Sequence, residues 1–179
     1  MAYKLRTATL DDQQRLHGLI ERSVRELSAN DYTPEQIKEA IGNTFGVDTQ
    51  LIKDETYFVV EEQSSGQIVG CGGWSFRKTL FGSDFVKERS ASELDPASEA
   101  AKIRAFFVDP SITRAGLGSM LLSHCEAEAT ARGFRKLELM STLPGQRFYA
   151  AKGYIYTGDH YHELSPGLKI KFISMRKSL

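Results

Sequence analysis

Cysteine is scarce in this chain, and long apolar runs are absent from it. Only two cysteines occur among 179 residues, Cys71 in an apolar run and Cys125 in a helical pattern. Thiols in such places are typical of small buried side chains in a reducing compartment, which favours a cytoplasmic protein. The N-terminal residues lead straight into polar ones, without a segment of signal-peptide type. No stretch approaches the roughly 18 apolar residues that a membrane span needs, so we expect no membrane partner.

An excess of charge of either sign is lacking as well. Lys plus Arg and Asp plus Glu each number 23. This balance gives no indication of a nucleic-acid partner, which would need a basic surplus or stripe, nor of electrostatic attachment to a membrane. Hydrophobic residues make up 41% of the chain, enough for a packed core. A chain of this length suits one domain over residues 1–179.

The order of the expected elements indicates a mixed domain. Strands are expected over residues 3–8, 56–61, 67–76, 103–108, 136–140, 154–161 and 168–175. Helices are expected after residues 9–12, over 31–42, 47–53, 116–132 and 144–152. Such an order predicts an α+β domain with a mixed sheet. The strand–helix–strand unit from 103 to 140 should form a right-handed parallel crossover.

Two segments of the predicted fold stand out. The glycines of the expected strand 67–76 indicate a bulge, or the close approach of another backbone. The polar segment 77–101 is long for a connection in a compact domain, so we expect it to lie on the substrate side, with a helical turn over residues 92–102. The alternative for this segment is a mobile surface loop.

The stretch from Val108 to Ser119 is the part of the sequence that most clearly indicates a binding site. It lies between an expected strand and an apolar-periodic helix. Gly116 and Gly118 remove side chains where the helix begins, so backbone N–H groups can converge there on an anion. The positive end of the helix dipole adds to this attraction, and Arg114 can add a side-chain charge. The pattern predicts a cradle for a pyrophosphate.

Two other phosphate-binding loops do not fit this stretch. A dinucleotide-binding fingerprint needs a third glycine where Leu121 stands, and a P-loop needs Gly-Lys-Ser/Thr where the chain has Gly-Ser-Met. A helix that merely begins at a glycine-containing loop stays open as an alternative from this stretch alone.

A second stretch, Phe148 to Tyr154, reads Phe-Tyr-Ala-Ala-Lys-Gly-Tyr and follows the next expected strand. With both stretches in this order, the sequence resembles the GNAT superfamily of N-acetyltransferases. The resemblance covers residues 56–177 and is specific over 103–154. It implies a central, mostly antiparallel twisted sheet flanked by helices, with one parallel strand pair that splays apart.

The resemblance also implies a co-substrate and a set of site residues. Acetyl-CoA would lie with its pantetheine arm between the splayed strands, and no metal would be needed. Tyr149 matches the position that protonates the departing thiolate, and the Val108 backbone N–H would stabilise the oxyanion. The residues implied to bind the coenzyme are Phe107, Val108, Arg114, Ala115, Gly116, Leu117, Gly118, Ser119 and Thr142.

The chain departs from the family pattern at three places. Thr113 stands where the loop usually begins with Gln or Arg, and Thr142 stands where an Asn is frequent. Lys102 occupies the place of an acidic residue, so no general base carries over.

Other candidates for a base come from strand ends and a strand face. Glu61 and Glu62 end a strand, where a solvated strand end is the ordinary alternative. His160 and His162 share a strand face but lack a third metal ligand, so surface histidines are expected there, with base duty as the lesser alternative.

The expected activity is therefore transfer of an acetyl group to a primary amine, either a small molecule or a peptide. The alternatives are a non-catalytic acyl-CoA-binding module and a nucleotide-binding protein of another fold. A homodimer through the last strands is a further expectation.

Overall fold

Seven strands form one mixed sheet in the computed structural model, within the residues it describes: 2–86, 89–112 and 114–179. In spatial order they are β1 (Tyr3–Thr7), β2 (Tyr57–Glu62), β3 (Ile68–Ser75), β4 (Ala101–Val108), β5 (Lys136–Ser141), β7 (Leu168–Ser178) and β6 (Ile155–Ser165). Neighbouring strands are antiparallel except β4 and β5, which run parallel. This arrangement confirms the predicted fold class.

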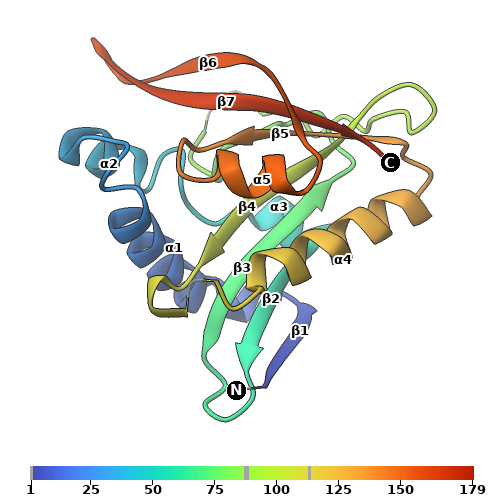
Figure 1. Cartoon of the computed structure of the whole chain (residues 1–179), viewed down its shortest axis with the longest axis horizontal. Helices are drawn as coiled ribbons and strands as arrows, with labels where there is room; N and C mark the ends of the chain where they lie inside the picture. Colours follow the sequence, from blue (N-terminus) through green and yellow to red (C-terminus); the bar gives the residue numbers. More distant parts are fainter. Residues whose placement is uncertain (1, 87–88, 113) are drawn as a thin grey trace.

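Helices pack on both faces of the sheet (Figure 1). One face carries α1 (Gln13–Leu27), α2 (Pro34–Ala40) and α3 (Thr49–Lys53), and the other carries α4 (Leu117–Ala131) and α5 (Gln146–Ala151). Two short 3-10 helices, η1 (Leu10–Asp12) and η2 (Pro110–Ile112), precede α1 and α4. The long β6–β7 hairpin extends toward α2 (Figure 1). Each face of the sheet therefore has its own apolar core.

The parallel pair β4–β5 is joined over only a short length. The paired residues are Ala101 with Leu137 and Lys102 with Glu138. Beyond them the strands diverge, and residues 105–108 are only half-buried although they lie in the middle of the sheet. The predicted splayed parallel pair is thus present, and its mouth exposes one edge of β4.

A bulge in β4 lies at the point of divergence. Gly73 pairs with Arg104 and Cys71 with Phe107, so the residue between them on β3, Gly72, faces two residues of β4. One of these two, Ala105, has a φ of 55°, a left-handed value that is unusual for a side chain with a Cβ. A Cβ on Gly72 would lie 2.7 Å from the ring of Phe106. The bulge that the glycines indicated is therefore confirmed, and only glycine fits opposite it.

The bulge changes which side chains face which layer. Before it, Ala101 and Ile103 face the α4 side, whereas after it Phe106 and Val108 do. Phe107 consequently packs on the opposite side, with the α1 core. The Tyr57 hydroxyl donates a hydrogen bond to the Ala105 carbonyl at 3.0 Å and holds the bulge from β2.

One sequence prediction is wrong in this region. The expected helical turn over 92–102 is only a turn at 96–98, and β4 begins at Ala101 instead of residue 103. Lys102 pairs with Ser75 on one side and with Glu138 on the other, so sheet pairing outweighs the local helical preference. Cys71 and Cys125 are buried free thiols, as expected. Among the described residues, no helix has the length and apolarity to cross a membrane.

Candidate functional site

A cleft of about 820 Å³ opens where β4 and β5 diverge. Its walls come from both faces of the sheet, and we divide it accordingly. The α4 half lies on the side of helices α4 and α5. Its lining comes from the segments 112–119 and 139–149, together with Phe106 and Val108, whereas Met140 belongs to the other half. The α1 half is formed by residues drawn from 23–28, 44–46 and 80–82, together with Arg104, Ala105, Phe107, Met140 and Phe172.

The α4 half contains the start of helix α4. Arg114 and Gly116 both have left-handed backbone angles, with φ of 67° and 81°. The Met120 N–H donates to the Gly116 carbonyl at 3.0 Å, so the N–H groups of residues 117–119 have no acceptor inside the helix. No acceptor is recorded for these donors among the described residues, and their place at the positive end of a helix of 15 residues is suited to bind an anion.

Gly118 keeps this site open. A Cβ there would lie 3.2 Å from the Phe148 ring, a distance that ordinary packing rarely shows. Arg114, with its left-handed backbone, is exposed and lines the cleft two residues before Gly116. Arg147, at the start of α5, is also exposed and lines the cleft, which gives the α4 half two cationic side chains.

The exposed edge of β4 supplies backbone groups to the cleft. The Asp109 N–H donates to the Val69 carbonyl on β3 at 2.8 Å. Because successive N–H groups of a strand point to opposite edges, the Val108 N–H points the other way, toward the gap left by β5. The Phe107 N–H instead faces the Cys71 thiol on β3, and the Phe107 ring lines the α1 half.

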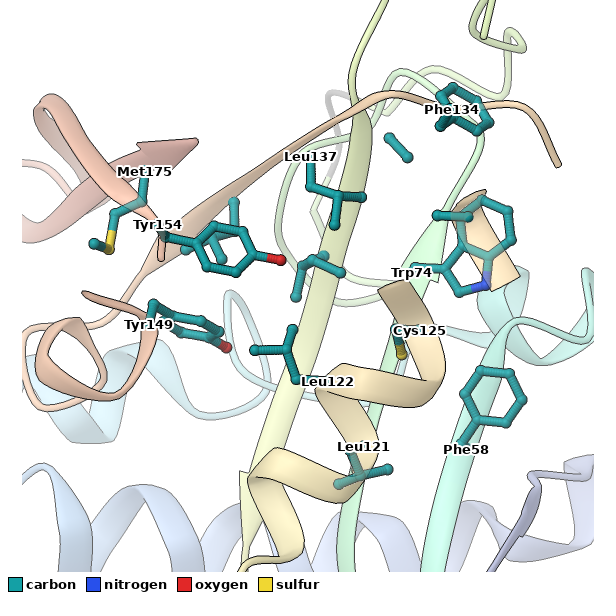
Figure 2. Close-up of a cluster of buried hydrophobic side chains, with 14 of the residues drawn as sticks. Phe58, Trp74, Leu121, Leu122, Cys125, Phe134, Leu137, Tyr149, Tyr154 and Met175 are labelled. Carbon is teal, nitrogen blue, oxygen red and sulfur yellow. The ribbon is translucent and has the colours of Figure 1, made fainter. Parts of the chain in front are cut away.

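Tyr149 lines the α4 half from helix α5. Its ring packs edge-on against Phe106, Phe148 and Tyr154, with centroid distances of 6.3, 5.0 and 5.7 Å. Figure 2 shows its hydroxyl directed toward Leu122 of α4. Burial raises the pKa of Tyr149 far above its usual value, so the phenol stays protonated at neutral pH. A protonated phenol at a cleft wall can donate a hydrogen bond or a proton, and its raised pKa makes it a weaker acid than a solvated tyrosine.

Most of the site residues predicted from the sequence come together in the cleft. Those that line it are Phe107, Val108, Arg114, Gly116, Leu117, Gly118, Ser119, Thr142 and Tyr149. Ala115 is exposed and is not part of the lining, and Thr113 lies outside the described residues. The Thr142 hydroxyl accepts a hydrogen bond from the Gly145 N–H at 3.3 Å, which leaves its own O–H available to a ligand.

The α1 half is built from aromatic rings. Phe45 contacts Phe107 and Phe172 with centroid distances of 6.1 and 5.9 Å, and Phe81 contacts Phe172 at 5.8 Å. The four rings form a continuous apolar wall whose members come from a loop, the segment after β3, β4 and β7. Edge-on and tilted contacts of this kind are favourable between aromatic side chains.

Thr44 is a polar residue beside that wall, on the same side of the cleft as Ser23, Ser28 and Arg104. It is 6% exposed, and among the described residues its hydroxyl oxygen is the one buried side-chain polar atom without a hydrogen-bond partner. An unpaired buried hydroxyl destabilises a fold by about 1–3 kcal/mol. Such a group in a cleft wall is a feature that a bound ligand would satisfy.

A buried ion cluster holds the segment after β3 against the cleft. Asp48 and Arg104 are almost fully buried and pair at 2.7 Å, while Arg89 donates to the other Asp48 oxygen at 2.8 Å. Arg104 also donates to the carbonyls of Thr79 and Gly82 at 3.0 and 2.8 Å. The cluster therefore fixes Phe81 and its neighbours in the wall, on the side where we expected the substrate.

The candidate bases do not line the cleft. Glu61 accepts a hydrogen bond from Arg6 at 2.6 Å, at a place outside the cleft wall. His160 and His162 both pack on Phe81, with centroid distances of 5.5 and 5.2 Å, and lie behind the wall that Phe81 forms. No Asp, Glu, Lys or His side chain lines the cleft in the part of the chain that the structure describes. No group of three His, Cys, Asp or Glu residues suited to a metal is found there either.

Sequence reasoning placed Phe107 and the segment 77–101 near the ligands, but it missed the aromatic wall as a unit and the bulge residue Ala105. Phe45, Phe81 and Phe172 lie in three distant segments without a shared motif, so no local signal marked them. Tyr57 gave no signal either, because its contact with Ala105 depends on the strand register.

The comparison with protein families agrees with this geometry. Residues 20–154 match the model of the acetyltransferase (GNAT) family. The chain belongs to the GNAT family. No match was found among curated proteins. The family assignment accounts for the splayed strands and the glycine loop at α4.

Solved structures share the fold of this GNAT protein over its whole length. A GCN5-related N-acetyltransferase from Rhodopseudomonas palustris matches 100% of this chain and 97% of its own, with 20% identity and a TM-score of 0.72. The PaiA N-acetyltransferase from Thermoplasma acidophilum, solved in complex with coenzyme A, matches over 100% of both chains with 15% identity and a TM-score of 0.66. At these identities the likeness concerns the fold.

Proposed function

We propose that residues 1–179 form one N-acetyltransferase domain, which transfers an acetyl group from acetyl-CoA to a primary amine while both are bound. One observation carries the proposal. The N–H groups of the first turn of α4, the exposed edge of β4 and the buried Tyr149 phenol line the same half of one cleft. A phosphate cradle, a strand edge and a proton donor are the parts that an acyl-CoA reaction needs.

The α4 half fits the coenzyme in chemistry. The N–H groups of residues 117–119 would bind the pyrophosphate, with Arg114 and Arg147 at its sides. The open edge of β4 would hold the amide groups of the pantetheine arm, as an added strand is held at a sheet edge. Acetyl-CoA supplies the activated acetyl group as a thioester.

The reaction is a direct displacement. The amine nitrogen forms a bond to the thioester carbonyl carbon, and the carbon–sulfur bond breaks with its electron pair on sulfur. The nitrogen loses one proton and the sulfur gains one, so the products are an N-acetyl amine and the free thiol. The Val108 N–H, which points into the gap, would stabilise the charge on the carbonyl oxygen.

Tyr149 would give the proton to sulfur. Its raised pKa keeps the phenol protonated, and the proton that leaves nitrogen can restore it after the transfer. The apolar rings around it exclude water, which strengthens its interaction with a developing thiolate.

The test of this function follows the release of free thiol. Purified protein is incubated with acetyl-CoA and a panel of primary amines, and product acetyl-amines are identified by mass. We expect thiol and acetyl-amine in equal amounts with at least one amine. Binding of acetyl-CoA without any amine-dependent thiol release would contradict the proposal.

A non-catalytic acyl-CoA-binding module is the second candidate. The observation that favours it is the lack of a carboxylate or imidazole in the described cleft lining, because such a group usually deprotonates the amine. The same thiol assay separates the two candidates.

A further inference from the structure

The α1 half of the cleft is where an acceptor would meet the acetyl group, and its composition is unusual for a binder of ammonium groups. Four phenylalanine rings form its continuous wall, in contact through Phe45 and Phe172. Phe81 and Phe107 are half-buried, so each presents part of its ring to the cleft. An apolar wall of this kind favours a ligand with a flat hydrophobic body.

The charges around the α1 half oppose a cationic ligand. The charged side chains that line the whole cleft among the described residues are Arg104, Arg114 and Arg147, and no carboxylate accompanies them. Asp48 pairs with the lining residue Arg104, and both of its oxygens are engaged, by Arg89 and Arg104. An alkylammonium ion would therefore lose its hydration without gaining a partner.

A carboxylate on the ligand would not find a partner in the α1 half either. Arg104 is 3% exposed, and its guanidinium already donates to Asp48 and to the carbonyls of Thr79 and Gly82. The two other arginines lie in the α4 half, beside the proposed pyrophosphate site. The α1 half is thus adapted to an uncharged ligand.

Thr44 would give this ligand a polar point of attachment after its side chain rotates toward the cleft, since its oxygen is enclosed in the present conformation. Its hydroxyl is buried in the wall and lacks a hydrogen-bond partner within the described protein. The Ser83 hydroxyl is engaged with the Asn43 carbonyl and the Tyr57 hydroxyl with the Ala105 carbonyl, so neither pairs with Thr44. Ser23 and Ser28 add two further hydroxyls to the lining of this half. A bound molecule with one hydrogen-bonding group would complete the site.

We propose that the acceptor is a primary amine with an aromatic body, bound as the uncharged free base between the phenylalanine rings and hydrogen-bonded to Thr44. This inference rests on the proposed acetyl transfer and adds the class of the acceptor. The amine loses its ammonium proton to water before it binds. After attack on the thioester, the second proton leaves nitrogen and one proton reaches sulfur, as described above.

Loss of the ammonium proton to water before binding can be tested, because no base lines the described part of the cleft. Of the titratable groups that line the cleft, Arg104 is bonded to Asp48, Arg114 and Arg147 lie in the α4 half, and Tyr149 is a phenol. His160 and His162 pack on Phe81 and are not part of the lining, and the Tyr32 hydroxyl donates to the Lys171 carbonyl. Without a base in contact with the acceptor, kcat/KM for the amine follows the ionisation of the free amine in solution. With an enzymic base, the midpoint would belong to the enzyme and stay the same for every amine.

The first experiment compares two acceptors with the same ring. The pKa of the alkylamino group of phenethylamine is about 10, whereas the pKa of the α-amino group of phenylalanine amide is about 7.7. We expect the midpoints of the two kcat/KM profiles to differ by about two pH units. A common midpoint for both amines would overturn the free-base inference, even if acetyl transfer itself is confirmed.

The second experiment tests the aromatic body and the lack of charge recognition. At one pH, rates are corrected to the concentration of free base. Phenethylamine should then exceed spermidine and free phenylalanine by about 100-fold in kcat/KM, since each added charge would be buried without a partner. Transfer to spermidine or to the amino acid at equal or greater efficiency would overturn the acceptor class.

The third experiment tests Thr44 with two substitutions. Thr44→Val removes the hydroxyl at nearly constant volume, and Thr44→Ser keeps it. We expect Thr44→Val to lower kcat/KM for phenethylamine about tenfold, the effect of one hydrogen bond in a buried site, while KM for acetyl-CoA stays unchanged. Thr44→Ser should retain activity near that of the parent. Equal activity of the parent and Thr44→Val would overturn the role of this hydroxyl.

A matched pair of phenylalanines in one segment controls for general damage. Phe81 lines the cleft, whereas Phe85, four residues later, is 62% exposed. Phe81→Ala should raise KM for phenethylamine by about tenfold through loss of apolar contact, with KM for acetyl-CoA unchanged, and Phe85→Ala should not. Equal effects of the two changes would overturn the aromatic wall. Failure of every amine, by contrast, would remove the proposed function itself.

Discussion

The two halves of the cleft are built by different means. In the α4 half the working groups are mainly backbone N–H groups, exposed by Gly116, Gly118 and the splay of β4 from β5. In the α1 half they are side chains, namely four aromatic rings and the hydroxyl of Thr44. A backbone site depends on local conformation, whereas a side-chain wall depends on segments that meet only in the fold.

The difference fits the two ligands that we propose. A coenzyme with an invariant pyrophosphate and amide groups can be held by main-chain donors, which side-chain substitutions leave in place. An acceptor is selected by shape and charge, and those properties come from side chains that can vary. The halves should therefore respond differently to substitution.

The largest effect is expected where the α1 half depends on a buried charge. Asp48→Asn leaves Arg104, which is 3% exposed, without its carboxylate, and should lower the free energy of unfolding by about 3–5 kcal/mol. Glu21→Gln breaks the exposed pair with Arg25 and should change it by less than about 0.5 kcal/mol. Urea denaturation measures both. Similar small losses would mean that the ion cluster does not support the wall.

The next effect sharpens the role of the α4 half in chemistry. Tyr149→Phe removes the proposed proton donor but keeps the ring that packs on Phe106 and Tyr154. We expect kcat to fall about 100-fold while the dissociation constant of coenzyme A stays the same. Rapid-mixing assays of thiol release and calorimetric titration measure the two quantities. A parallel loss of both would make Tyr149 a packing residue.

A smaller effect is expected from blocking the backbone donors. Gly118→Val places a branched side chain against the Phe148 ring at the start of α4 and should weaken coenzyme A about tenfold or more. Gly158→Val is the matched control, because a Cβ at Gly158 meets nothing within 4 Å in strand β6. The control should bind coenzyme A as the parent does. Unchanged affinity in Gly118→Val would contradict the backbone site.

The smallest effect concerns alkaline pH. Burial raises the pKa of Tyr149 above the value of an unfolded tyrosine, so protonation favours the folded state. This contribution to stability is full below about pH 10 and is lost as the pH rises through the raised pKa. The tyrosinate absorbance of the parent minus that of Tyr149→Phe should show no step near pH 10. A step there would place the phenol in water.

Much of the α4 half could be predicted from the sequence, because its signals are local. Gly116, Gly118 and the Phe-Tyr pair before Gly153 stand at fixed spacings around one strand–helix–strand unit. The start of α2 depends on neighbouring residues in the same way, since the Thr33 hydroxyl accepts a hydrogen bond from the Gln36 N–H at 3.1 Å.

The α1 half could not be predicted, since it depends on contacts between distant segments. Phe45, Phe81 and Phe172 meet only after the sheet has formed. The left-handed angle at Ala105 likewise follows from the register of β3 with β4 and has no sequence signal at that residue. The prediction of a helical turn over 92–102 failed for the same reason, because pairing with the neighbouring strands makes the end of that segment part of β4.

Calorimetric titration of coenzyme A into the parent protein, Gly118→Val and Thr44→Val tests the central claim most directly. The account predicts binding with one site per chain in the parent, a clear loss of affinity in Gly118→Val and parental affinity in Thr44→Val. Absence of binding to the folded parent, or equal weakening by both substitutions, would contradict a cleft whose α4 half holds the coenzyme through its backbone.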